Sequence, residues 1–156
     1  CAGAVAVAAP GEEETMRQLL NRYGLNRFVL AVVAGGRERQ HSVWNGLNAL
    51  PEDAQCVLIH DGARALVTEA VISRALESVA LHGSGVAAVP MVDTVKRAAA
   101  DGLVLETPDR SCLYAVQTPQ GFRCEVIRQA HIGKFVHEKV DGNRQRTLVL
   151  IVRQPK

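Results

Sequence analysis

A carboxylate and a guanidinium lie three residues apart in the segment VLIHDGARAL, where an apolar run ends. Asp61 is a hard oxygen ligand, and Mg²⁺ is commonly held by one or two carboxylates together with substrate phosphates. Arg64 offers a planar fork that matches phosphate oxygens. A helix cap or an ion pair with Arg64 would explain Asp61 as well, so both interpretations stay open on this segment alone. His60 ends the apolar run, and we interpret it as structural rather than as a general base.

The segment GGRERQHS carries a second set of polar residues after another apolar run. Its paired glycines, Gly35 and Gly36, let the backbone approach a ligand closely. Arg39 supplies another guanidinium, and Ser42 supplies a hydroxyl. Singly, the glycines fit a turn, Arg39 fits a solvated surface and Ser42 fits a first helical turn. Two arginines in neighbouring loops, Arg39 and Arg64, are stronger evidence for phosphate binding.

Three further segments extend this polar set. DTVK contains Thr94, TPQ contains Thr118, and the dipeptide DR contains Arg110. Each of them also fits a capped or closed turn. The sequence holds no Walker loop, GxGxxG fingerprint, GxSxG elbow or metal-spaced histidine set. Residue types and spacing alone therefore predict a site for a phosphorylated small molecule and a divalent cation.

Apolar runs alternate with amphipathic segments in the first part of the chain. The predicted strands are 4–9, 28–34, 56–59 and 86–92, and the predicted helices are 12–24, 42–50 and 68–79, the last capped by Thr68. Apolar strands that alternate with helices are typical of a parallel sheet covered on both faces. Ligands of such sheets bind beyond the carboxyl ends of the strands, so we expect the polar loops to converge there. The predicted fold is α/β, with a doubly wound, mostly parallel sheet.

The second part of the chain changes character. Thr94–Ala99 and Leu103–Glu106 flank Asp101-Gly102, which is a hairpin signal. We expect a protruding arm at about residues 93–117 that leaves the main sheet. We also expect a strand at 113–116, a helix at 124–131 and a strand at 147–152. The length of 156 residues fits a single domain.

The composition excludes several classes of protein. A net charge of +2 and an aromatic content of 4% argue against a nucleic-acid partner. No apolar run reaches the roughly 20 residues that span a bilayer, and the apolar start lacks the basic leader of a signal peptide. We therefore expect an intracellular protein with no membrane partner. The cysteines lack metal-site spacing, and we interpret them as reduced and packed: Cys1, Cys56, Cys112 and Cys124.

Four segments together resemble consecutive signatures of the 2-C-methyl-D-erythritol 4-phosphate cytidylyltransferase family. They are GGRERQHSVWNGL, VLIHDGARALV, VPMVDTVKRA and DRSCLYAVQTPQGF, and the resemblance covers about residues 5–131. It implies a Rossmann-like nucleotidyltransferase domain at 1–156, whose protruding β-arm interlocks a homodimer. It also implies transfer of CMP from CTP to methylerythritol phosphate with release of pyrophosphate, in the non-mevalonate route to isoprenoids. Such an enzyme would work in the bacterial cytoplasm, or in the plastid stroma of a plant.

The resemblance also assigns the polar residues to the two substrates. The residues expected to bind CTP are Gly35, Gly36, Arg39 and Ser42. The residues expected to surround methylerythritol phosphate are Arg64, Thr94, Arg110 and Thr118. Asp61 is expected to hold Mg²⁺ and, with Arg64 and Arg110, to form the catalytic set. Arg110 and Thr118 are expected to act across the dimer.

The chain departs from the family pattern at both ends. The family begins with a glycine-rich loop that contains an arginine and precedes a Pro-Lys pair, whereas Cys1 corresponds to the second strand. Ala65 stands where the family has proline, and Gly62 stands where it has alanine. A Thr-Asp-Asp segment is not found between Phe135 and Lys156. We therefore expect a family member without its phosphate loop, which is completed by residues outside this sequence or else is inactive as it stands.

Two alternatives stay open. A ribitol 5-phosphate cytidylyltransferase shares related HDxxR, DT and QTPQ signatures. The run RERQHSVWNGL followed by LYAVQTPQGF favours the methylerythritol enzyme. The other alternative is a truncated, non-catalytic relative that dimerises through the arm.

Overall fold

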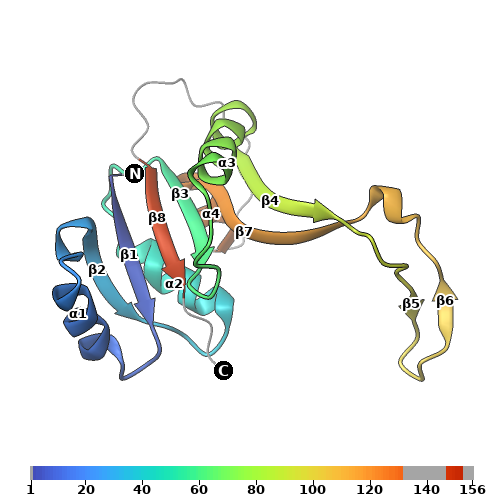
Figure 1. The fold of residues 1–156 in the computed structure, drawn as a ribbon, viewed down its shortest axis with the longest axis horizontal. Helices are drawn as coiled ribbons and strands as arrows, with labels where there is room; N and C mark the ends of the chain where they lie inside the picture. Colours follow the sequence, from blue (N-terminus) through green and yellow to red (C-terminus); the bar gives the residue numbers. More distant parts are fainter. Residues whose placement is uncertain (1, 132–146, 153–156) are drawn as a thin grey trace.

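The computed structural model describes residues 2–131 and the backbone of residues 147–152 (Figure 1). The strands are β1 (Gly3–Ala8), β2 (Val29–Ala34), β3 (Cys56–Asp61), β4 (Ser84–Pro90), β5 (Arg97–Ala98), β6 (Val104–Glu106), β7 (Tyr114–Arg123) and β8 (Thr147–Val152). The helices are α1 (Glu13–Arg22), α2 (Arg39–Asn48), α3 (Glu69–His82) and α4 (Cys124–His131), with short 3-10 turns η1 (Asn26–Phe28) and η2 (Arg110–Cys112). Among these helices, none has the length and apolar character needed to cross a bilayer.

Six of the strands form one sheet in the order β2-β1-β8-β3-β7-β4. β1 pairs in parallel with β2 and β8, and β8 pairs in parallel with β3. β7 is antiparallel to both β3 and β4. The predicted α/β fold with a mostly parallel sheet is confirmed. The carboxyl ends of the parallel strands meet at one edge, which is where ligands bind in such sheets.

β8 lies in the middle of this sheet. Its backbone places Leu150 opposite Val5 of β1 on one side and opposite Ile59 of β3 on the other. Within the described residues, β8 joins the β2-β1 pair to the β3-β7-β4 half. The strand predicted at 147–152 is therefore confirmed, and its central position is a finding that the sequence pattern did not indicate.

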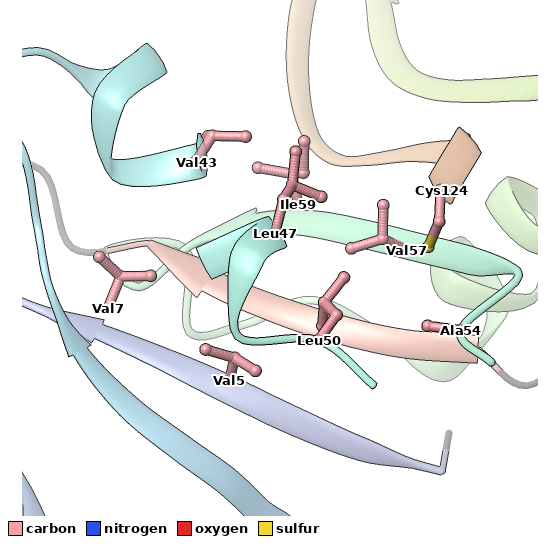
Figure 2. Close-up of a cluster of buried hydrophobic side chains, with 9 residues drawn as sticks. All are labelled: Val5, Val7, Val43, Leu47, Leu50, Ala54, Val57, Ile59 and Cys124. Atoms are coloured by element: carbon pink, nitrogen blue, oxygen red, sulfur yellow. The ribbon is translucent and has the colours of Figure 1, made fainter. Parts of the chain in front are cut away.

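A buried apolar cluster fills the space between α2 and the sheet (Figure 2). Alternate residues of β1 and β3 contribute to it, because strand side chains alternate between the two faces. The members are Val5, Val7, Val43, Leu47, Leu50, Ala54, Val57, Ile59 and Cys124. Burying each of the larger side chains contributes about 1.5–3 kcal/mol. This cluster therefore fixes the position of α2, and with it the first turn of that helix.

The helix α3 covers the opposite face of the sheet. A side chain at Gly121 of β7 would meet both Val79 of α3 and Leu58 of β3. Leu58 thus faces α3, while its neighbours along β3 face α2. Gly85 of β4 has no room for a side chain, because a Cβ there would meet the backbone carbonyl of Ala75. This close approach seats α3 directly on β4 and β7.

Cys56, Cys112 and Cys124 are free thiols. Burial raises the pKa of the Cys124 thiol to about 11 and also raises the pKa of Cys56. Both thiols stay protonated at neutral pH and pack as small apolar groups. Cys112 is exposed, so the predicted packing is confirmed for Cys56 and Cys124 but is wrong for Cys112. Cys1 lies outside the described residues.

Two boundary predictions and one capping prediction are corrected by the structure. α2 begins at Arg39 rather than at Ser42, so Arg39 lies in the first turn of a helix instead of in a loop. TPQ was expected in a loop but lies inside β7, where Gln120 pairs with Ile59 of the antiparallel neighbour β3. Thr68 takes the N-cap position of α3, yet its side chain makes no capping hydrogen bond.

The predicted hairpin is confirmed as β5 and β6. Asp101 Oδ1 accepts a hydrogen bond from the backbone N–H of Leu103 at 3.0 Å, and Gly102 has a φ of 88°. That left-handed conformation favours glycine. Figure 1 shows the hairpin projecting away from the main sheet, at the far end of the extensions of β4 and β7.

Candidate active site

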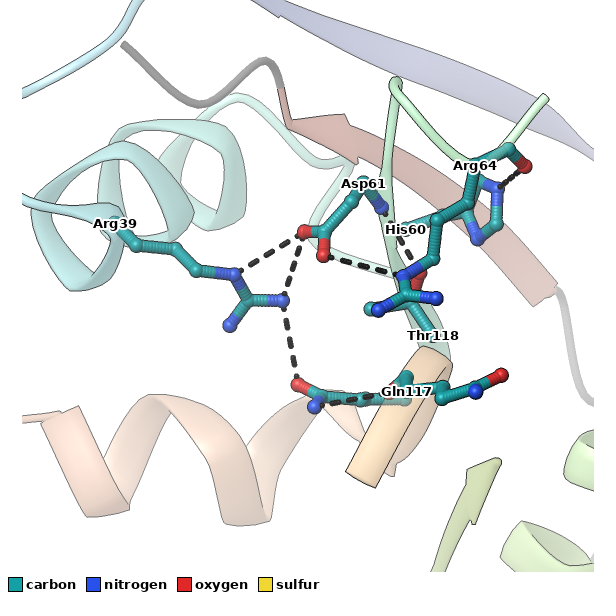
Figure 3. A network of polar contacts seen from close by, with 7 residues as sticks. Arg39, His60, Asp61, Arg64, Gln117 and Thr118 are labelled. Carbon is teal, nitrogen blue, oxygen red and sulfur yellow. Dashed lines mark hydrogen bonds and ion pairs between the residues drawn. The ribbon is translucent and has the colours of Figure 1, made fainter. Parts of the chain in front are cut away.

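Asp61 is the last residue of β3 and presents its carboxylate at the edge where the parallel strands end (Figure 3). Arg39 donates to it from the first turn of α2, with Nε and Nη2 each 3.2 Å from Oδ1. Arg64 approaches the other oxygen, with Nε 3.9 Å from Oδ2. The side chain of Asp61 is only 16% exposed, so water screens these charges weakly. The two arginines that the sequence places in neighbouring segments therefore flank one carboxylate.

β7 supplies the remaining contacts of this carboxylate and its partners. The backbone N–H of Asp61 donates to Thr118 Oγ1 at 3.2 Å, and Thr118 is buried. Gln120 Oε1 accepts from Arg39 Nη2 at 3.4 Å, and Gln120 Nε2 donates to the carbonyl of Gln117 at 3.2 Å. The residues that we call the Asp61 network are Arg39, Asp61, Arg64, Thr118 and Gln120.

Gln117 and Gln120 received no role from the sequence. Both belong to the QTPQ run, which carried only a family resemblance. The information that was missing is the register of β7 against β3. Because Gln120 pairs with Ile59, two residues before Asp61, its side chain can reach the guanidinium of Arg39. A register between distant strands cannot be derived from the spacing within one strand.

His60 fixes the turn that links Asp61 to Arg64. Its Nε2 lies 3.0 Å from the carbonyl oxygen of Arg64, and the backbone N–H of Arg64 donates to the carbonyl of Asp61 at 2.9 Å. His60 is buried, and its Nδ1 has no hydrogen-bond partner among the described residues. Because the accepting atom is a carbonyl, Nε2 must carry the proton. This geometry agrees with the structural interpretation of His60.

Ser42 closes the turn that follows β2. The backbone N–H of Gly36 donates to Ser42 Oγ at 3.0 Å, and Ser42 is buried. A Cβ at Gly35 would lie 3.0 Å from the carbonyl oxygen of Ala8, and a Cβ at Gly36 would overlap with His41. Both glycines are therefore needed for the backbone to pass here. The structure brings Gly35, Gly36 and Ser42 together, next to the helical turn that carries Arg39.

Thr94 and Arg110 lie elsewhere in the chain. Arg110 is in η2 at the base of the hairpin, where its Nη1 donates to the carbonyl of Val92 at 2.7 Å. Asp109 caps η2, and hydrogen bonds from Ser111 lower the pKa of the Asp109 carboxyl. Thr94 is exposed on the segment between β4 and β5. Within one chain, the described structure brings neither Thr94 nor Arg110 into contact with the Asp61 network.

Cavities open on two sides of the Asp61 network. One of about 660 Å³ lies against α3, β4 and β7, and Arg64 and Thr118 line it. Another of about 410 Å³ is lined by Arg39 and Gln120 together with apolar residues of α2 and α4. Volumes of this size suit small-molecule ligands. Four residues that surround Asp61 therefore line spaces into which parts of a substrate could extend.

The donor set of the network fits a hard cation that is shared with phosphate groups. Oδ1 of Asp61 is taken by Arg39, while Oδ2 has only the long contact with Arg64. Mg²⁺ typically binds one or two carboxylates and completes its shell with phosphates and water. Groups of three or more His, Cys, Asp or Glu that could ligate a metal are absent from the described residues. Asp61 is the carboxylate of the network, so a cation that bound there together with phosphates would contact Asp61.

Comparison with known proteins decides the family. The family model of IspD, 2-C-methyl-D-erythritol 4-phosphate cytidylyltransferase, matches residues 2–143. The chain belongs to this family. A cytidylyltransferase of that name from Pelotomaculum thermopropionicum is 48% identical over 128 residues, which cover 81% of this chain and 53% of the relative. One from Halalkalibacterium halodurans is 50% identical over 149 residues, or 96% of this chain and 64% of the relative.

The cytidylyltransferase fold is found in a solved structure as well. The crystal structure of 4-diphosphocytidyl-2C-methyl-D-erythritol synthase from Anaerococcus prevotii matches with a TM-score of 0.72 at 24% identity. The match covers 99% of this chain and 73% of the other. The predicted family and the predicted nucleotidyltransferase-like fold are therefore confirmed. The chain spans about half the length of the relative from Pelotomaculum.

Replacing Thr118 with valine tests the support that β7 gives to Asp61. Valine keeps the shape but removes the acceptor for the part-buried Asp61 N–H, and leaving such a donor unpaired costs about 1–3 kcal/mol. We expect denaturant unfolding to show a loss of that size for Thr118→Val. Thr118→Ser, which keeps the hydroxyl, is the matched control and should lose less. Equal losses in the two variants would mean that the hydroxyl does not hold the Asp61 backbone.

Proposed function

We propose that the protein transfers CMP from CTP to 2-C-methyl-D-erythritol 4-phosphate and releases pyrophosphate, in the non-mevalonate route to isoprenoids. The observation that carries this proposal is the Asp61 network, in which one carboxylate and two guanidiniums meet at the carboxyl end of β3. Membership of the cytidylyltransferase family supports the choice of reaction. The names of the relatives support the choice of substrates.

This reaction needs positioning and charge neutralisation more than a proton acceptor. A phosphate oxygen of the alcohol phosphate attacks the α-phosphorus of CTP, a new P–O bond forms, and the bond to the pyrophosphate leaving group breaks. Arg64 would bind phosphate oxygens through its guanidinium. Asp61 would hold Mg²⁺ through its carboxylate, beside the guanidinium of Arg64. When bound, Mg²⁺ would supply positive charge to the triphosphate.

The cytosine of CTP would lie against the turn formed by Gly35, Gly36 and Ser42. Support comes from the tight turn that both glycines allow after β2, because a side chain at either position would meet Ala8 or His41. The buried Ser42 hydroxyl holds the Gly36 amide and so fixes the shape of this surface. Arg39 is expected to bind CTP as well, and its guanidinium contacts Asp61 and Gln120.

A homodimer formed through the arm is the second part of the proposal. The arm and the strand ends beside it expose several large apolar side chains: Val92, Leu103, Val104, Leu105, Tyr114 and Val116. Apolar surface of this extent is typical of interaction sites. A second copy of the chain would supply Thr94 and Arg110 to methylerythritol phosphate bound beside Arg64. Thr118 was expected to act across the dimer, but we propose that it acts within its own chain, since its hydroxyl accepts from Asp61.

The bacterial origin of the two relatives supports a location in the bacterial cytoplasm, which we propose for this protein. A plastid location stays a prediction for a plant protein. The ribitol 5-phosphate alternative has less support, because both relatives carry the methylerythritol name.

A pyrophosphate-release assay tests the proposed reaction. With CTP and Mg²⁺, we expect release when methylerythritol phosphate is offered and none when ribitol 5-phosphate is offered. Asp61→Asn should reduce the rate by about 10²–10³-fold, the usual loss for one electrostatic group in a transition state. Glu77→Gln, which neutralises an exposed carboxylate on α3, is the matched control and should keep the rate. Release with ribitol phosphate alone would contradict the substrate, and release with neither would favour the non-catalytic alternative.

Mixing two inactive variants tests the proposed dimer. If Arg110 serves the partner's site, a dimer of one Asp61→Asn chain and one Arg110→Ala chain contains one intact site. In an equal mixture of co-refolded chains, half of the dimers are mixed, and each mixed dimer has one intact site out of two. The mixture should therefore recover about a quarter of the wild-type activity. Recovery near zero would show that Arg110 acts within its own chain, and full activity of Arg110→Ala by itself would show that Arg110 has no role in the reaction. Self-mixing of each variant is the control and should recover nothing.

A further inference from the structure

β8 lies at the point where the strand order of the sheet reverses. From β8, the chain order runs outward through β1 and β2 on one side and through β3 on the other. In doubly wound sheets this switch point is where ligands bind, beyond the carboxyl ends of the strands. β8 is parallel to both of its neighbours, so its own carboxyl end lies at that edge. The residues that follow β8 therefore leave the sheet at the position most suited to a ligand.

The register of β8 fixes where the strand ends. Val152, its last residue, pairs with Asp61 of β3 on one side and with Val7 of β1 on the other. Neighbouring strands lie about 5 Å apart, so the backbone of Val152 lies directly beside that of Asp61. On the other side, the carbonyl of Ala8 accepts a hydrogen bond from the backbone N–H of Gly35 at 2.7 Å. β8 thus ends between the strand that carries Asp61 and the strand end that holds the Gly35 turn.

The sequence that follows β8 is basic. It reads RQPK, so Arg153 comes directly after Val152 and Lys156 comes four residues after it. Four residues span at most about 14 Å even when they are fully extended. The covalent chain therefore keeps both cations close to the strand end beside Asp61.

The Asp61 network leaves room for further positive charge. Its two guanidiniums, Arg39 and Arg64, surround one carboxylate, so a single positive charge remains. The triphosphate of CTP carries several negative charges, and transfer of a phosphoryl group depends on neutralising them. Arginine binds phosphate oxygens with a planar fork, and lysine binds them as a point charge. Two more cations at this edge would complement the charge of a triphosphate.

We propose that β8 delivers Arg153 and Lys156 to the carboxyl edge of the sheet, where the two residues bind the triphosphate of CTP. The inference rests on the proposed function for the identity of the nucleotide. It gives β8 a role beyond completing the sheet, because the strand brings two binding residues to a site otherwise built from residues 35–120. Sequence spacing does not indicate this role, since the role depends on the register of β8 between β1 and β3.

Binding of CTP tests this inference without requiring turnover. With Mg²⁺ present, calorimetric titration of Arg153→Gln/Lys156→Gln should give a dissociation constant for CTP that is higher by about tenfold or more, the scale of one or two charge-assisted hydrogen bonds. Binding of cytidine, which has no phosphate, should not change. Arg22→Gln/Arg27→Gln is the matched control, because it removes the same charge from exposed residues before the start of β2, at the opposite edge of the sheet. This control should keep the affinity of the wild-type chain for CTP.

The outcomes separate this inference from the proposed function. Amide hydrogen exchange should be slow at residues 148–151, because β8 is paired on both sides. Rapid exchange there would overturn the inference, since the register that places Arg153 would be lost. Unchanged CTP affinity in Arg153→Gln/Lys156→Gln, with weaker binding in Arg64→Gln, would overturn the role of the two cations and leave the proposed function intact. Absence of CTP binding to the wild-type chain would contradict the proposed function, and this inference with it.

Discussion

The ion pair between Arg39 and Asp61 connects the first turn of α2 to the last residue of β3. β3 is buried along almost its whole length, so the position of its final carboxylate is set by the core rather than by a loop. α2 is held from the same core through Leu47, which packs in one cluster with Ile59 of β3 (Figure 2). Packing thus brings the two charges together, with Arg39 at Oδ1 of Asp61 and Arg64 near Oδ2.

β7 connects this site to the arm. The strand begins at Tyr114 beside η2 and passes Thr118 and Gln120 on its way to α4. β7 is antiparallel to both β3 and β4. Its part that pairs with β3 carries residues of the Asp61 network, and its beginning, which pairs with β4, supports the arm. Any second chain that binds the arm would therefore contact a segment that is continuous with the site (Figure 1).

Much of the fold follows from the sequence, since strands such as Val29–Ala34 and Cys56–Asp61 are continuous apolar runs separated by helical spacing. The placement of the Gly35–Gly36 turn after β2 and of Asp61 at the end of β3 could also be predicted, because the carboxyl ends of parallel strands share one edge. The partners of Arg39 could not. They depend on α2 beginning at Arg39 and on the register of β7, both of which are set by contacts between segments far apart in the chain.

The central place of β8 was equally beyond the sequence pattern. An apolar run at 147–152 predicts a strand, but nothing in it indicates insertion between β1 and β3. That choice depends on which backbone edges are left unpaired by the rest of the sheet, a property of the assembled fold. The hairpin of the arm, unlike β8, is determined by local sequence. Asp101-Gly102 forms its turn, and the hairpin lies where these residues predict it.

The side-chain Nε–H signal of Arg39 in proton–nitrogen NMR spectra tests the central ion pair most directly. We predict a resolved, slowly exchanging signal in the wild-type chain that moves to the position of a free guanidinium and exchanges rapidly in Asp61→Asn. An Arg39 signal that is the same in both proteins would show that the guanidinium does not hold Asp61, and the account of this site would then be wrong.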